Sequence, residues 1–95
     1  LDMVPYSFID QDRVVSLPDH DDDYPMSIDN PSKRTRRGPT SPKFDAVNVL
    51  PEITNATIRW IEQTTSTAPQ QPFFAYIPLA SPHTPIVPNE QWKGQ

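Results

Sequence analysis

The residues with the clearest capacity for chemistry stand near the C-terminal end, in a turn where one histidine lies between prolines. The sequence there is Ser81-Pro82-His83-Thr84-Pro85. An imidazole can take up or release a proton near neutral pH, so it can serve as a general acid or base. Ser81 and Thr84 each precede a proline, which favours extended backbone. Such a stiff segment indicates that the histidine side chain is held in position for a function. The alternative is a loop histidine that has no function.

The apolar run before this turn predicts a buried strand that carries the histidine. Residues 72–79 read Pro-Phe-Phe-Ala-Tyr-Ile-Pro-Leu. The run is short, rich in aromatic residues and apolar on both faces, as strands of parallel sheets are. Pro78 lacks the N–H that a strand ladder needs, so pairing should stop near it. His83 would then lie just beyond the carboxyl end of a strand, where open α/β sheets bind their ligands.

A helix is predicted over residues 51–65, before this strand. Pro51 suits the first helical position, and Glu52 places a negative charge in the first turn. An apolar stripe follows the helical repeat through Ile53, Thr57, Trp60 and Ile61. A helix, a polar linker and an apolar strand in this order form the second half of a βαβ unit.

The N-terminal part predicts a hairpin followed by a long charged loop. Residues 4–9 and 13–17 are β-prone runs on either side of a tight connection, so a hairpin is expected in residues 1–17. Residues 18–43 carry few apolar side chains and are expected to form a surface loop. The loop begins acidic and turns basic from residue 33 onward, so we expect its charges to pair with one another.

Two sharper interpretations of the charged loop are open. His20 and the aspartates around it could bind a hard cation such as Ca²⁺, but they lack the glycine-turned spacing of a calcium-binding loop. The basic run could be a localisation signal or a polyanion-binding patch. The net charge of −4 argues against nucleic acid as the main partner. We assign no metal ligand in this loop.

The composition is unusual for an independently folding domain. Hydrophobic residues make up 35% of the chain, against about 45–50% in ordinary globular proteins when glycine is also counted. There are thirteen prolines and two glycines, and no cysteine, so disulfides and thiolate chemistry are excluded within these residues. No apolar run approaches the ~18 residues of a membrane-spanning helix. We expect the chain to be an internal segment of a longer protein.

Three stretches, in this order along the chain, resemble the arylsulfatases of the formylglycine type. The most specific is residues 72–85, with its Pro-His-Thr-Pro turn, continued by Val87-Pro88 and Trp92-Lys93-Gly94. The two earlier stretches are Leu1-Asp2-Met3-Val4-Pro5-Tyr6 with Asp12-Arg13-Val14-Val15, and Phe44 leading to Val49-Leu50-Pro51-Glu52-Ile53-Thr54. Residues 18–38 match no part of the family pattern. Val4 stands where a second proline is expected, and Lys43 where glycine is common.

The resemblance implies an α/β, alkaline-phosphatase-like fold, of which this chain would hold a central fragment. That fragment would comprise the hairpin at 1–17, the charged loop at 18–43, the helix at 51–65, the strand at 72–79, and an active-site loop with a following turn at 80–95. The implied location is secreted or periplasmic. The implied substrate is a small-molecule or carbohydrate sulfate ester, with no nucleic-acid partner and no membrane span in these residues.

The implied activity is that of a sulfuric ester hydrolase, which cleaves sulfate monoesters with a formylglycine nucleophile and a divalent cation, usually Ca²⁺. The formylglycine precursor lies in a Cys/Ser-x-Pro-x-Arg motif, which does not occur in this sequence. Residues matching the family's cation ligands are not found either. Both groups would therefore come from outside these residues, and the segment alone is expected to be inactive.

His83 is the one residue to which the resemblance assigns a role. It matches the histidine of the family's Pro-His-x-Pro turn, which is catalytic and binds the substrate sulfate. The histidine could protonate the leaving oxygen or donate a hydrogen bond to a sulfate oxygen, and the sequence leaves both open. The alternative functions are a phosphodiesterase or phosphonate hydrolase of the same superfamily, and a disordered regulatory segment with Ser41-Pro42 as a phosphorylation site.

Overall fold

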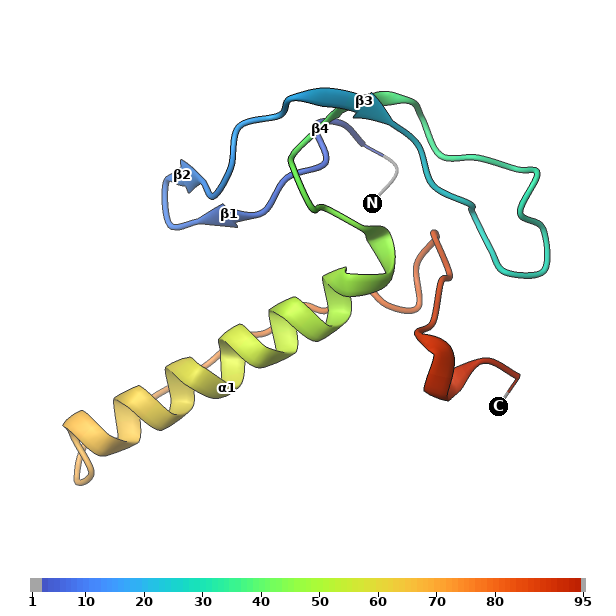
Figure 1. Cartoon of the computed structure of the whole chain (residues 1–95). Helices are drawn as coiled ribbons and strands as arrows, with labels where there is room; N and C mark the ends of the chain where they lie inside the picture. The colour runs from blue at the N-terminus through green and yellow to red at the C-terminus, as the bar shows by residue number, and fades with distance from the viewer. Residues whose placement is uncertain (1–2, 95) are drawn as a thin grey trace.

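Two small antiparallel hairpins form the N-terminal half of the chain in this computed structural model, which describes residues 3–94 (Figure 1). In the first, β1 (Ile9–Asp10) pairs with β2 (Arg13–Val14), and Ile9 lies opposite Val14. This hairpin lies where the sequence predicts one, but each strand has only two residues. Gln11 in the turn has a φ of 55°, a left-handed conformation that such a tight connection requires.

The second hairpin lies inside the region that the sequence predicts to be one long loop. β3 (His20–Asp22) pairs with β4 (Gly38–Thr40), and His20 lies opposite Thr40. The prediction of a surface loop over 18–43 therefore needs correction at both of its ends. The region buries three small polar residues whose hydroxyls are satisfied by hydrogen bonds, namely Thr35, Thr40 and Ser41.

The core of the molecule is a cluster of aromatic side chains beneath these hairpins. Tyr6 and Tyr24 are buried and meet edge to face, with ring centroids 5.3 Å apart. Phe44 stacks on Tyr6 at 5.8 Å. Tyr6 is also fixed through its backbone, because its N–H donates to the carbonyl of Pro39 at 2.8 Å. The core therefore joins the N-terminal segment to the strand β4.

The helix α1 (Val49–Thr67) is longer than predicted at both ends. A 3-10 turn, η1 (Ala46–Asn48), precedes it, and Asp45 caps that turn by accepting from the Val47 N–H. Pro51 thus occupies the third helical position. Its missing N–H still costs nothing there, because the N–H groups of the first helical turn have no carbonyl partner within the helix. At the other end, the hydroxyls of Thr65, Ser66 and Thr67 donate to carbonyls one turn earlier, so these polar side chains are satisfied within a helix that runs to residue 67.

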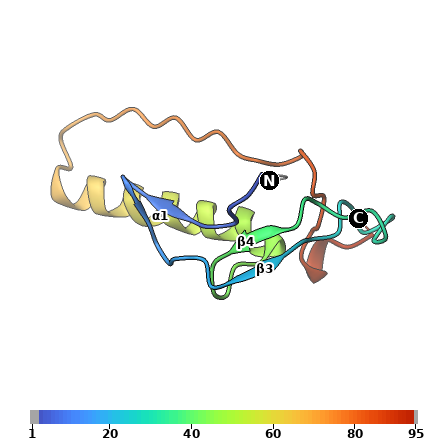
Figure 2. The same cartoon turned by 90° about the horizontal axis from the view of Figure 1, so that it is seen from above.

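The buried strand that the sequence predicts over residues 72–79 is not formed. These residues are exposed throughout, with Phe74 at 88% and Tyr76 at 80% of full exposure. The segment instead runs back alongside α1 as extended chain (Figure 2), and Trp60 meets Phe73 edge to face at 5.2 Å. An extended segment becomes a strand only when another backbone pairs with it, and no described residue does so here.

The chain ends in a short irregular region. A turn at 80–85 is followed by an extended piece and then the 3-10 turn η2 (Glu90–Trp92). Residue 95 lies outside the described residues, so the last position of the expected 80–95 loop is not placed. Among residues 3–94, no helix has both the length and the apolarity needed to cross a membrane.

Candidate functional site

His83 lies in the tight turn that joins the extended segment to the C-terminal region. Its backbone N–H donates to the carbonyl of Ala80 at 3.0 Å, which closes the turn. Pro85, two residues later, is buried, and Val87 packs against the aromatic core of Tyr6 and Tyr24. The histidine turn is therefore attached to the core on its C-terminal side.

The imidazole of His83 is exposed and has one ring nitrogen engaged. Nδ1 lies 2.8 Å from the backbone carbonyl of Thr84, and because a carbonyl can only accept, Nδ1 carries the proton. The Thr84 hydroxyl lies at the edge of contact, 3.5 Å from the same nitrogen. Nε2 has no partner among the described residues. It accepts a proton or a hydrogen bond in the neutral ring and donates one in the imidazolium.

A groove of about 630 Å³ opens beside this turn. One wall is the beginning of α1 with η1, and the other is the chain from residue 80 to residue 92. The apolar part of the lining includes Val47, Leu50, Ile53, Pro85, Val87 and Trp92. His83 is the only titratable side chain on the groove, because its described lining holds no Asp, Glu, Lys or Arg. The arrangement offers one proton-transfer group at the border of an apolar surface.

Asn89 is a residue of this groove that the sequence did not single out. Its side-chain oxygen is buried and has no hydrogen-bond partner among the described residues. It lies between Pro88 and the first residue of η2. A single asparagine in a proline-rich stretch carries no spacing signal, so only the structure could reveal it.

The acidic end of the charged loop is organised by ion pairs, as the charge pattern predicts. Arg34 Nε lies 2.5 Å from Asp23 Oδ1, and Arg37 Nη1 lies 3.8 Å from Asp23 Oδ2. His20 Nδ1 lies 2.6 Å from Asp19 Oδ1. No group of three or more metal-ligating side chains gathers among residues 3–94.

The strongest electrostatic perturbation lies in the core beneath the site. Burial raises the pKa of Tyr24 from 10.0 to about 12, and the negative charges of Asp22 and Asp45 add to the effect. The Tyr24 hydroxyl donates to the carbonyl of Phe44 at 3.0 Å. This phenol therefore stays protonated and serves as a structural hydrogen-bond donor.

The comparisons with known proteins give no independent support for a family. No protein-family model, no curated protein and no solved structure matches the chain. The resemblance to the arylsulfatases consequently rests on the ordered motifs of the sequence, and the function that it implies is a proposal.

Proposed function

We propose that the chain is part of a sulfuric ester hydrolase of the formylglycine type and that His83 acts on the substrate sulfate ester. The observation that supports the proposal is the hydrogen bonding of the His83 ring. It stands in the Pro-His-Thr-Pro turn, its Nδ1 is held by the Thr84 carbonyl at 2.8 Å, and its Nε2 faces no described partner. A ring held in this way presents a single nitrogen to a ligand.

The chemistry of sulfate ester cleavage suits this nitrogen. As the bond from sulfur to the ester oxygen breaks, negative charge develops on the leaving oxygen, and a proton donor within hydrogen-bond reach stabilises it. In the imidazolium form, Nε2–H can donate to that oxygen or to a non-bridging sulfate oxygen.

The remaining parts of the reaction lie outside residues 3–94 in this proposal. The sequence contains no formylglycine precursor motif, and the described carboxylates form no cation site. A divalent cation would supply charge neutralisation of the sulfate oxygens. Residues 3–94 would contribute the histidine, the turn that orients it and the apolar groove beside it. Export from the cytoplasm is part of the same proposal.

Substrate turnover by the complete gene product that contains residues 1–95 tests the proposal. The product should release inorganic sulfate from an aryl sulfate such as 4-nitrophenyl sulfate, and should do so faster than it hydrolyses bis(4-nitrophenyl) phosphate. A preference for the phosphodiester would favour the phosphodiesterase alternative instead. Absence of both activities after loading with Ca²⁺ or Mg²⁺, and with the upstream cysteine or serine verified as formylglycine, would refute the proposal.

The disordered-segment alternative finds less support. The hydroxyl of Ser41, the candidate phosphorylation site, is engaged in the core region: it donates to the carbonyl of Ser16 at 2.5 Å and lies 2.6 Å from the Ser7 hydroxyl. Ser41 is also buried. A kinase needs an exposed, extended hydroxyl, so this site would require the region to unfold first.

A further inference from the structure

The second hairpin reaches the histidine turn through its backbone. The Ile86 N–H donates to the carbonyl of Met26 at 2.9 Å, and the Ile28 N–H donates to the carbonyl of Ile86 at 3.3 Å. Ile86 follows His83 by three residues, and it forms a parallel bridge with Ser27. A segment from the charged loop, which resembles no part of the sulfatase pattern, thus holds the chain immediately after the histidine.

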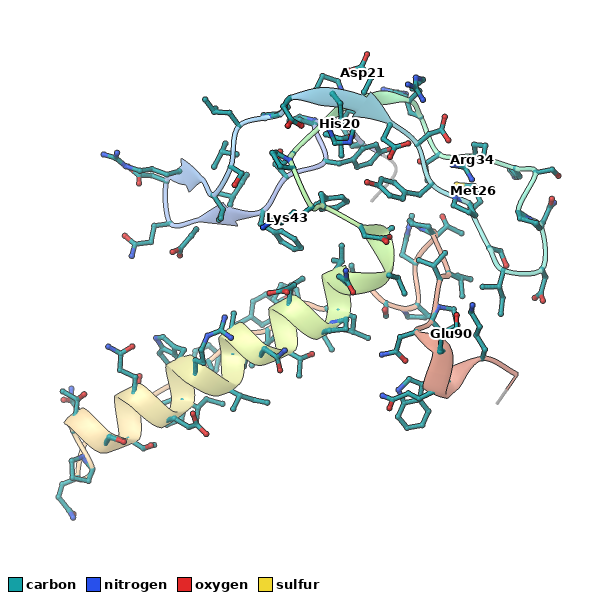
Figure 3. The ribbon with its side chains drawn as sticks, in the orientation of Figure 1. His20, Asp21, Met26, Arg34, Lys43 and Glu90 are labelled. Atoms are coloured by element: carbon teal, nitrogen blue, oxygen red, sulfur yellow. The ribbon has the colours of Figure 1, made fainter. Side chains whose placement is uncertain are left out.

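The arms of this hairpin are joined by Arg34 and Asp23. The guanidinium donates from Nε to Asp23 Oδ1 at 2.5 Å and from Nη2 to the Asp23 carbonyl at 2.6 Å. On the same rungs, the Met26 N–H donates to the carbonyl of Lys33 at 2.8 Å, and Pro25 bridges to Arg34. Figure 3 shows Met26 and Arg34 close together on the two arms, beyond the end of β3.

The hydrogen bonds from Arg34 to Asp23 are suited to fixing the position of one hairpin arm relative to the other. The side chain of Asp23 is only 22% exposed and that of Arg34 43%. Two donors in a planar fork hold one aspartate by its carboxylate and its backbone at once, so the arm is oriented as well as attracted. A lysine would not reproduce this fork, because its three donors lie on a single nitrogen at the end of a flexible side chain. Since exposed ion pairs add little to global stability, the main effect of this pair is local.

We propose that Arg34 is a positioning residue for His83. It closes the arms of the second hairpin through Asp23, so that the Met26 carbonyl can hold the Ile86 N–H and the histidine turn cannot drift from the groove. The inference rests on the proposed function for its effect on turnover, and on the structure alone for its effect on the turn. Catalytic groups tolerate little displacement, since about 1 Å of misplacement can cost about 100-fold in rate.

Arg34→Met in the complete gene product is the test, with Arg59→Met as its matched control. Arg59 is an exposed arginine of α1 and makes no ion pair among the described residues. Three properties are measured for each variant: kcat and KM with an aryl sulfate, amide hydrogen exchange at Ile86 and Ile28, and the ¹⁵N chemical shifts of the His83 ring. The exchange and ring signals report position even in a protein without measurable turnover.

Arg34→Met should lower kcat about 10- to 100-fold with KM within about twofold of wild type, speed exchange at Ile86 and shift the His83 ring signals. Arg59→Met should change none of these. Unchanged Ile86 exchange and unchanged ring signals in Arg34→Met would overturn the positioning role, whatever the turnover. Failure of the proposed function would look different: His83→Ala would leave turnover intact while the exchange effect of Arg34→Met remained.

Discussion

The imidazole of His83 combines two properties that a catalytic histidine needs. Its Nδ1 proton is donated to the Thr84 carbonyl, its Nε2 has no partner among residues 3–94, and the residue lines an apolar groove. The sequence predicts the residue because prolines frame it. The sequence could not predict which ring nitrogen is hydrogen-bonded. The acceptor is the backbone carbonyl of Thr84, and its direction depends on the conformation of the turn.

Lys43 has a backbone conformation that few residues other than glycine adopt. It stands where the arylsulfatases commonly have glycine, and its φ is 62°. This left-handed conformation favours glycine because a Cβ crowds the following carbonyl. The lysine is therefore held in a strained backbone conformation.

Tyr24 predicts a pH dependence of stability. Its pKa is raised from 10.0 to about 12 in the folded protein, so the unfolded state ionises first as the pH rises. The contribution of this phenol is complete below pH 10 and is lost between pH 10 and pH 12. At about 1.4 kcal/mol per pKa unit, the free energy of unfolding should fall by up to ~3 kcal/mol.

Urea unfolding of the complete gene product at pH 8, 10 and 11.5 measures this dependence. Tyr24→Phe is the control, because it removes the titrating hydroxyl and keeps the ring in the core. The variant should lose about 1 kcal/mol at pH 8 with its hydrogen bond to Phe44 and should then decline less with pH. Parallel pH curves for wild type and variant would contradict the assignment.

At the scale of elements, the sequence predicts what depends on local pattern and misses what depends on pairing. The helix follows from its apolar stripe, although Pro51 suggests too late a start because a proline is tolerated anywhere in the first turn. The strands β3 and β4 were missed because Asp21 and Pro39, which face each other, are both poor strand formers. Residues 72–79 have strong strand composition, but among the described residues no strand pairs with them, and their neighbour is the helix α1.

The strand β4 depends on a glycine at its first residue. A Cβ built on Gly38 would lie 2.5 Å from Val4 Cγ1, far inside the van der Waals distance. Gly38→Ala should therefore destabilise the protein by about 1–3 kcal/mol through overpacking. The double variant Gly38→Ala, Val4→Ala removes the obstructing methyl groups and should recover part of the loss in chemical denaturation. A single variant as stable as wild type would show that this approach is not tight.

The stability of the whole molecule depends on how much apolar surface it buries and how much it leaves exposed. The buried hydrophobic residues among those described are Tyr6, Tyr24, Ala46 and Val49. Large apolar side chains of α1 and of residues 72–79 remain exposed, including Trp60, Phe74 and Tyr76. The radius of gyration is 15.7 Å, against about 12 Å for a compact domain of this length. A core this small offers little to offset the entropy of ordering the chain.

We therefore expect residues 1–95, expressed alone, to show no cooperative thermal transition and no sulfatase turnover. Differential scanning calorimetry should give a trace without a heat-absorption peak, and a fluorescent apolar dye should bind at room temperature. The complete gene product, measured beside it, should give a sharp transition and little dye binding. A cooperative melt of the 95-residue chain would show that its small core is sufficient for folding.

His83→Ala in the complete gene product tests whether His83 acts on the substrate sulfate ester. The variant should lose turnover of an aryl sulfate by about 10²- to 10⁴-fold, the contribution of a positioned proton donor. His20→Ala is the control, because His20 lies on β3 and contacts Asp19 instead of the groove. It should stay within about twofold of wild type. Full turnover in His83→Ala would show that His83 takes no part in the reaction.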